Sequence, residues 1–289
     1  MFDDPAYPSS PPPPPDESIR PLSLFGAVLW VFGIELGFWW ALMLVGSLRE
    51  AADRDLISRL CCQLFVYTLG LFVLLRVHAP HASIRDFLAF RRTHGAFYPL
   101  SLGLGGAVAV PAAWLLALIE RHWPPAQQAD EFVRLFRLSS RPEQVGIALG
   151  VVILGPLLEE VIFRGALYRP LRKTSAPWLT VVVTAALFAA VHIDPRRMVP
   201  IFLVGLMLGY LRAASGSLLP AVLLHIGFNA VPFIDLFGSG QAAAGSDEAE
   251  ANVSTTLLLG ASAATGVGLW LVHLVASRSR RARGARRQD

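Results

Sequence analysis

Two adjacent carboxylates, Glu159 and Glu160, lie inside a long apolar stretch, residues 145–167, and Arg164 follows one helical turn after the second. A charge at the centre of a bilayer costs at least ~2.5–3.5 kcal/mol, so three charges in one span need a reason. Glu160 and Arg164 have the i,i+4 spacing and the order that favour an ion pair within a helix. Glu159 has no such partner on its own helix. We therefore expect Glu159 to act as a general base.

Two histidines and an asparagine in later apolar stretches can reach the same depth. His192 falls 17 residues after a turn near Ser175, and Glu159 falls 16 residues before it. In an antiparallel hairpin the two therefore lie at one level. His225 and Asn229 are spaced one helical turn apart on one face of a further stretch. Polar groups in lipid face the bundle interior or water, so we expect a polar cavity near mid-membrane.

The composition predicts a polytopic membrane protein that is all-α. Hydrophobic residues make up 54% of the chain, charged residues 16%, and the mean hydropathy is +0.52. An ordinary soluble domain has about 25% charged residues. The net charge of +4 could suggest nucleic acid, but six of the 25 basic residues crowd into residues 278–287. Anionic lipid headgroups explain such a tail better. A lipid membrane, and no nucleic acid, is therefore the expected partner.

About eight transmembrane helices are expected, because eight apolar segments have roughly the length that a bilayer requires. They cover residues 22–46, 57–77, 97–119, 145–168, 177–194, 198–213, 217–236 and 255–276. With both termini inside, 15 Lys and Arg residues lie inside and 9 outside. This excess predicts cytoplasmic termini in the inner or plasma membrane of a bacterium. Glu35 is also intramembrane, and we expect it to hydrogen-bond to a neighbouring helix.

Three short motifs lie in order on three of these segments. They read Glu159-Glu160-x-x-x-Arg164, Phe188-x-x-x-His192 and His225-x-x-x-Asn229. Together they resemble the signature motifs of the CPBP family, the CAAX proteases and bacteriocin-processing enzymes related to the Rce1 endopeptidase. The resemblance covers about residues 145–236 and leaves the first three apolar segments outside it. One motif alone would be weak support, whereas three in this order are specific.

The resemblance implies an intramembrane endopeptidase that hydrolyses a peptide bond near the membrane surface. Glu159 with His192 would activate the attacking water, and His225 with Asn229 would stabilise the oxyanion of the tetrahedral intermediate. No serine or cysteine is flanked by a base that would make it a nucleophile. The expected substrate is a peptide or protein with an apolar or lipidated segment near the inner surface.

Three further residues of the motifs would support this chemistry. Glu160, grouped here with the catalytic residues, would hold the helix and tune the site together with Arg164. Phe188 would pack beside the imidazole one turn later and fix its rotamer.

The use of a metal is open at this stage. Glu159, His192 and His225 are also the ligand types of a catalytic zinc site with an open position for water. A water activated by Glu and His needs no ion, and the soluble signature HExxH is absent. The cofactor is therefore unknown, with zinc as a candidate.

Two alternatives to a protease keep the polar cavity. A non-catalytic scaffold or immunity protein would bind a partner in the membrane, but such a protein would be free to lose the motif residues. An ion- or proton-coupled transporter would use the same residues as a relay. That alternative predicts broken helices or an internal repeat, and no repeat is evident in the sequence.

The predicted division of the chain has five regions. They are a disordered Pro-rich acidic tail at 1–21, transmembrane helices with interfacial segments at 22–144, a catalytic core at 145–236, an outer loop with the last transmembrane helix at 237–277, and a basic cytoplasmic tail at 278–289. Within the second region, residues 83–94 and 120–144 mix apolar and charged residues and are expected to lie on the membrane surfaces.

Overall fold

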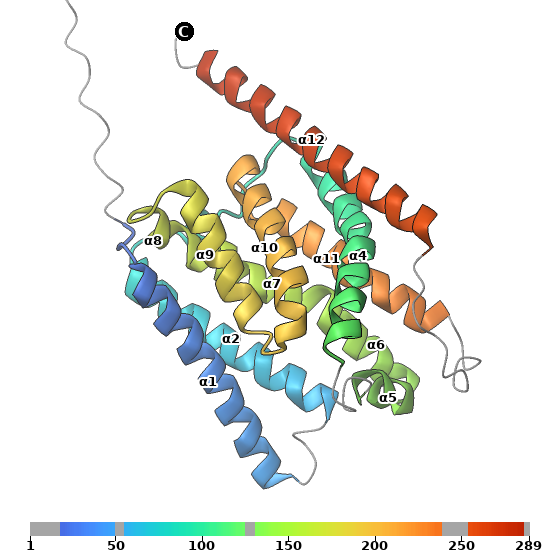
Figure 1. The fold of residues 1–289 in the computed structure, drawn as a ribbon. Coiled ribbons are helices and arrows are strands. Elements are labelled where there is room, and N and C mark those ends of the chain that lie inside the picture. Colours follow the sequence, from blue (N-terminus) through green and yellow to red (C-terminus); the bar gives the residue numbers. More distant parts are fainter. Residues whose placement is uncertain (1–17, 50–54, 125–130, 239–253, 286–289) are drawn as a thin grey trace, which may run out of the picture.

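The computed structural model of the chain describes residues 18–49, 55–124, 131–238 and 254–285 (Figure 1). These residues form helices and no strand. Six helical spans among them are long and apolar enough to cross a membrane, and two shorter helices are also apolar. The chain is therefore an all-α polytopic membrane protein, as the composition predicts. The predictions for the N-terminal tail, the outer loop and the end of the basic tail fall largely outside the described residues.

Each of the eight predicted apolar segments forms a helix. The elements are α1 Leu24–Leu48, α2 Leu56–His78, α3 Ile84–Phe87, α4 Phe97–His122, α5 Glu131–Leu138, α6 Arg141–Leu149, η1 Gly150–Leu154, α7 Gly155–Glu160, η2 Val161–Ala166, α8 Tyr168–Arg172, α9 Pro177–Ala190, α10 Pro195–Ser215, α11 Leu219–Gly238 and α12 Thr255–Ala285. The fourth predicted segment lies within a continuous helical span, Arg141–Arg172, that contains the two π-helical stretches η1 and η2. The fifth is shorter than predicted, because α9 ends at Ala190 and not at residue 194.

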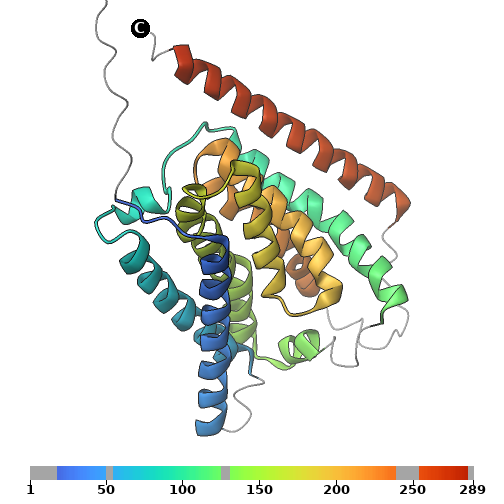
Figure 2. The same ribbon diagram turned by 60° about the vertical axis from the view of Figure 1, so that its left-hand side comes forward.

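The helices run back and forth between two ends of the bundle. One end, called here the basic end, carries the connections 79–96, 173–176 and 216–218. Hydrogen bonds join the first of these connections to the third and to Arg169 of α8. The other end, called the α5 end, carries α5, the start of α6 and the turn between α9 and α10 (Figures 1 and 2). The start of α1 and the last turns of α12 lie on the side of the basic end. The cytoplasmic placement of both termini stays a prediction.

Helices α4, α7, α10 and α11 lie between the α1–α2 hairpin and α12 (Figure 2). Helices α4 and α11 approach closely, because glycines lie where their backbones meet. A Cβ atom at Gly105 would stand 2.0 Å from the carbonyl oxygen of Leu224, and one at Gly227 would stand 2.4 Å from that of Leu102. This contact fixes the position of α11, which carries two of the predicted site residues.

The two predicted surface segments differ in how they are placed. Residues 83–94 contain only the four-residue helix α3, and Phe87 and Leu88 are buried, so this segment closes the basic end. A short helix is present as predicted, and its place at the membrane surface stays a prediction. Helix α5, in the second segment, is strongly amphipathic and packs Phe136 against Phe233 of α11.

Candidate active site

Two π-helical stretches, η1 and η2, flank the short helix α7 that ends with Glu159 and Glu160. At the first of them the N–H of Gly155 donates to the carbonyl of Gly150, and the next residue, Pro156, has no N–H to give. π-Helical turns are rare and are common at functional sites, because they change which face of the helix a side chain occupies. The local sequence thus sets the two carboxylates on an irregular part of the span.

Glu160 and Arg164 form the expected ion pair, and both side chains are fully buried. Nη1 of Arg164 donates to Oε1 of Glu160 at 2.9 Å, and Nη2 donates to the carbonyl of Gly205 on α10 at 3.0 Å. The guanidinium also lies 4.6 Å from the ring centre of Phe188. A buried charge needs such partners because the desolvation cost is otherwise large. The pair therefore ties the helical span Arg141–Arg172 to α9 and α10.

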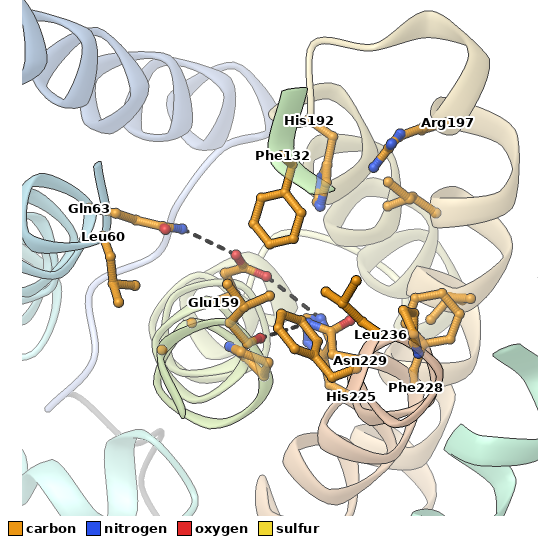
Figure 3. Close-up of a pocket in the computed structure, with 18 of the residues that line it drawn as sticks. Leu60, Gln63, Phe132, Glu159, His192, Arg197, His225, Phe228, Asn229 and Leu236 are labelled. Atoms are coloured by element: carbon orange, nitrogen blue, oxygen red, sulfur yellow. Dashed lines mark hydrogen bonds and ion pairs between the residues drawn. The ribbon is translucent and has the colours of Figure 1, made fainter. Parts of the chain in front are cut away.

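Glu159 has different surroundings and faces a cavity (Figure 3). Nε2 of Gln63, on α2, donates to Oε1 of Glu159 at 3.3 Å. Nε2 of His225, on α11, lies 3.7 Å from Oε2 of Glu159. Glu159 is thus held loosely between α2 and α11, and 15% of its side chain is exposed.

His225 bridges the two carboxylates. Its Nδ1 lies 3.1 Å from Oε1 of Glu160, while Nε2 faces Glu159. Because a carboxylate only accepts hydrogen bonds when ionised, the contact with Glu160 requires a proton on Nδ1. The ring also packs edge-on against Phe188, with 5.4 Å between ring centres. Glu160 therefore orients His225 as well as pairing with Arg164.

His192 lies in the turn after α9, two residues beyond the end of the helix. The prediction of a helical position for it was therefore wrong, because α9 stops at the left-handed turn at Ile193, where φ is 57°. Nδ1 of His192 lies 2.8 Å from the carbonyl of Phe188, which leaves Nε2 facing the cavity. The Phe188 ring packs edge-on at 5.0 Å from the imidazole. The expected contact between these two side chains is present.

The turn that carries His192 is held by Asp194. Its carboxylate accepts from the backbone N–H of Arg196 at the start of α10 and pairs with the Arg196 guanidinium at 2.9 Å. This hydrogen bond from the Arg196 side chain holds the pKa of Asp194 below its usual range. The carboxylate therefore stays ionised, and its stabilising effect on the turn is lost only as the pH falls below the ordinary Asp range.

Asn229 satisfies a carbonyl that the π-helical stretch η1 leaves without a helical partner. Nδ2 of Asn229 donates to the carbonyl of Val151 at 3.0 Å. In a regular helix that carbonyl would accept from Gly155, but Gly155 donates to Gly150 instead and Pro156 cannot donate. Asn229 also lines the cavity. It therefore has a structural contact and one further N–H that is free to face a ligand.

A cavity of about 710 Å³ joins Glu159, His192, His225 and Asn229. Its walls are mostly apolar, and Phe132 from α5 helps to cover it (Figure 3). The cavity extends from the carboxylates toward the α5 end, because its lining includes residues of α5 and of the last turns of α11. Toward the basic end the catalytic span is closed, since residues 160–168 are all buried. The expected convergence of polar groups is thus present, in a cavity with one open direction.

Glu159, His192 and His225, the residues predicted as possible zinc ligands, line one cavity. Nδ1 of His225 contacts Glu160 and Nδ1 of His192 contacts the carbonyl of Phe188, so Nε2 of each ring is left for the cavity. Such contacts are typical of histidines that bind metals. Within the described ranges, however, no group of three or more His, Cys, Asp or Glu side chains is close enough together to hold a metal ion. The use of zinc therefore stays a prediction.

Several cavity residues lie outside the motifs and were missed in the sequence. Gln63, Phe132, Arg137 and Arg197 all line the cavity. Gln63 could have been found in the sequence, because an amide within an apolar span must find a polar partner. Arg137 and Arg197 could not, because arginines next to membrane spans are common.

Comparisons with known proteins match the part of the chain that carries the motifs. Residues 141–231 match the family model described as Rce1-like, type II CAAX prenyl endopeptidase Rce1-like. An uncharacterised 24.3 kDa protein of Escherichia coli is 36% identical over 107 residues, 35% of this chain and 49% of that protein. The chain thus spans about half the length of that curated relative. No solved structure matches significantly.

Proposed function

Since the chain carries a domain of the Rce1-like CAAX protease family in an integral membrane bundle, we propose that it is an intramembrane endopeptidase. The observation that supports this most is the cavity around Glu159. It brings a carboxylate that has no Lys or Arg partner among the described residues, two histidines and an amide together beside apolar walls. Hydrolysis of a peptide bond requires a base for water and donors for the developing oxyanion. The cavity contains residue types for both tasks.

In the proposed mechanism, Glu159 takes a proton from water that lies in the cavity. His192 orients this water through Nε2, because its Nδ1 is occupied by the carbonyl of Phe188. The hydroxide attacks the substrate carbonyl, and the charge that forms on its oxygen is stabilised by the second N–H of Asn229 and by Nε2–H of His225. Because Nδ1 of His225 donates to Glu160, this role requires His225 to carry protons on both ring nitrogens. Glu159 then returns the proton to the leaving amine. Every step of this mechanism uses water and side chains.

Glu160 acts through its neighbours in this mechanism. It orients His225 at 3.1 Å and neutralises Arg164 at 2.9 Å. Phe188 supports both imidazoles at once, since its ring lies 5.0 Å from that of His192 and 5.4 Å from that of His225. These residues hold the site, whereas Glu159 carries the proton.

The proposed substrate is a peptide or protein with an apolar or lipidated segment. Apolar side chains form most of the cavity wall, and the bundle is embedded in lipid, so the cavity suits a chain that enters partly from the membrane. Arg137 and Arg197 add positive charge on the side of the α5 end. The sequence alone did not indicate these two cations.

The direction of the cavity changes one expectation from the sequence. The excess of basic residues favours a cytoplasmic basic end in a bacterial inner or plasma membrane. The cavity, however, extends toward the α5 end. With cytoplasmic termini, the cavity would therefore extend toward the non-cytoplasmic side. We favour the charge rule, and hence access from the non-cytoplasmic side, which suits maturation of an exported peptide.

The test compares membranes that contain the wild-type protein or Glu159→Gln, with peptide cleavage products followed by mass spectrometry. Products that are present with wild type and absent with the variant are expected. Each sample is repeated with a zinc chelator, and the mechanism above predicts that the chelator leaves the products unchanged. Equal products from wild type and variant would overturn the proposal and favour a non-catalytic membrane scaffold.

A further inference from the structure

Gln63 on α2 lies outside the matched residues 141–231 and yet contacts the proposed catalytic base. We propose that Gln63 is a positioning residue for Glu159, and that Tyr67 and Glu35 hold Gln63 in the required orientation. The inference rests on the proposed endopeptidase function and deepens it. It assigns a role in the reaction to the α1–α2 hairpin.

The contact between Gln63 and Glu159 fixes one oxygen of the carboxylate. Nε2 of Gln63 donates to Oε1 at 3.3 Å, while His225 lies 3.7 Å from Oε2 on the opposite side (Figure 3). An amide donates a hydrogen bond without carrying a charge. It therefore orients the carboxylate without neutralising its charge, unlike the ion pair between Glu160 and Arg164.

The amide of Gln63 is itself supported by Tyr67. Tyr67 lies one helical turn further along α2, is 4% exposed and interacts with the Gln63 side chain. The hydroxyl of Tyr67 donates to Oε1 of Glu35 on α1, so the phenol oxygen is left as an acceptor. The phenol oxygen of Tyr67 and the Glu159 carboxylate can both accept hydrogen bonds. They therefore favour the nitrogen rather than the oxygen of the Gln63 amide on the side of Glu159.

The same chain of contacts gives Glu35 a role. A carboxylate within a membrane helix is costly unless it has a partner, and the expected hydrogen bond to a neighbouring helix is the one to Tyr67. The pair links α1 to α2 beside the catalytic span, since both residues line a small gap against Ile162 and Phe163. Loss of either residue would free the Gln63 amide to rotate.

The test measures kcat/KM against pH for purified wild type, Gln63→Met and Gln63→Glu. Met has a similar length but no donor, so the rate at neutral pH is expected to fall about 3- to 10-fold, because a hydrogen bond to a charged group is lost. The acidic limb of the profile should move to higher pH in Gln63→Met. In Gln63→Glu it should move further, because a second carboxylate opposes ionisation of the first. KM should change little.

A matched control and a second variant separate the role of Gln63 from general effects of substitutions in α2. Thr68→Val removes an exposed hydroxyl elsewhere on α2 and should leave the profile unchanged. Tyr67→Phe keeps Gln63 but removes its support, and a smaller shift in the same direction is expected. If Gln63→Met does not yield monodisperse protein, Gln63→Asn gives the same measurement, because its amide is one methylene too short to reach Glu159.

The outcomes separate the inference from the function. Cleavage that depends on Glu159, together with an acidic limb that is unchanged in the Gln63 variants, would overturn the positioning role alone. Absence of any cleavage that depends on Glu159 would instead overturn the proposed function. A general loss of stability would lower the rate at all pH values without moving the limb, and this result also contradicts the inference.

Discussion

Glu159 and Glu160 are neighbours in the chain, but the fold gives them different surroundings. Glu160 is fully buried between Arg164 and His225, whereas Glu159 faces the cavity and contacts the neutral amide of Gln63. A paired carboxylate is a poor base, because the adjacent cation stabilises its ionised form. The carboxylate without such a pair is therefore the one suited to accept a proton.

At Arg164 the expected effect of substitution is on stability. Arg164→Ala leaves Glu160 as an unpaired charge in a fully buried place, which should cost about 3–5 kcal/mol. Thermal denaturation in detergent measures this loss. Arg278→Ala, at an exposed position on α12, is the control and should melt like wild type. An Arg164→Ala protein as stable as wild type would show that the ion pair does not hold the fold.

At Asn229 two effects should appear together. Asn229→Ala removes the donor to the Val151 carbonyl, so stability should fall by about 1–3 kcal/mol. Loss of an oxyanion donor typically lowers kcat about 100-fold or more. Melting temperature and single-turnover rate are measured on the same preparation. A stable protein with an unchanged rate would remove Asn229 from both roles.

At the scale of the helices, the sequence predicted the eight apolar segments and the meeting of Glu159, His192, His225 and Asn229 at one cavity, because hydrophobic length and the three motifs are local signals. It did not predict the π-helical stretches around Glu159, which depend on where Gly155 finds its hydrogen-bond acceptor. It also placed His192 on a helix, although the helix ends two residues earlier. The contact with Gln63 was missed because it joins residues 96 positions apart.

The crossing of α4 and α11 should tolerate no side chain at Gly105. A Cβ there would stand 2.0 Å from a backbone oxygen of α11, so Gly105→Ala must push the helices apart. Both stability in detergent and cleavage rate should fall, because α11 carries His225 and Asn229. Gly103→Ala, two residues away with open space around it, should be neutral or slightly stabilising. Equal behaviour of the two variants would contradict this account of the crossing.

At the scale of the whole molecule, the helices of the proposed active site are enclosed by parts of the chain that the family match does not include. The α1–α2 hairpin supplies Gln63, and α5 supplies part of the cavity wall. The sequence could not show that the cavity extends away from the basic end, because this direction follows from how the helices pack.

The topology follows from combining the cavity with the charge distribution. In a variant without Cys61 and Cys62, single cysteines are placed at Leu138 near the cavity and at His81 at the basic end, both exposed positions. A membrane-impermeant maleimide added to intact cells should label Leu138→Cys. It should label His81→Cys only after the membrane is opened. The reverse pattern would show that the basic end faces outward and that the cavity opens to the cytoplasm.

The most direct test of the central claim is the single-turnover cleavage rate of purified Glu159→Gln, measured on the substrate identified in membranes. The account predicts a protein that melts like wild type and cleaves about 100-fold to 10,000-fold more slowly, the usual contribution of a general base. Thermal denaturation of the same sample confirms the fold. A folded Glu159→Gln protein that cleaves at the wild-type rate would contradict the assignment of Glu159 as the base.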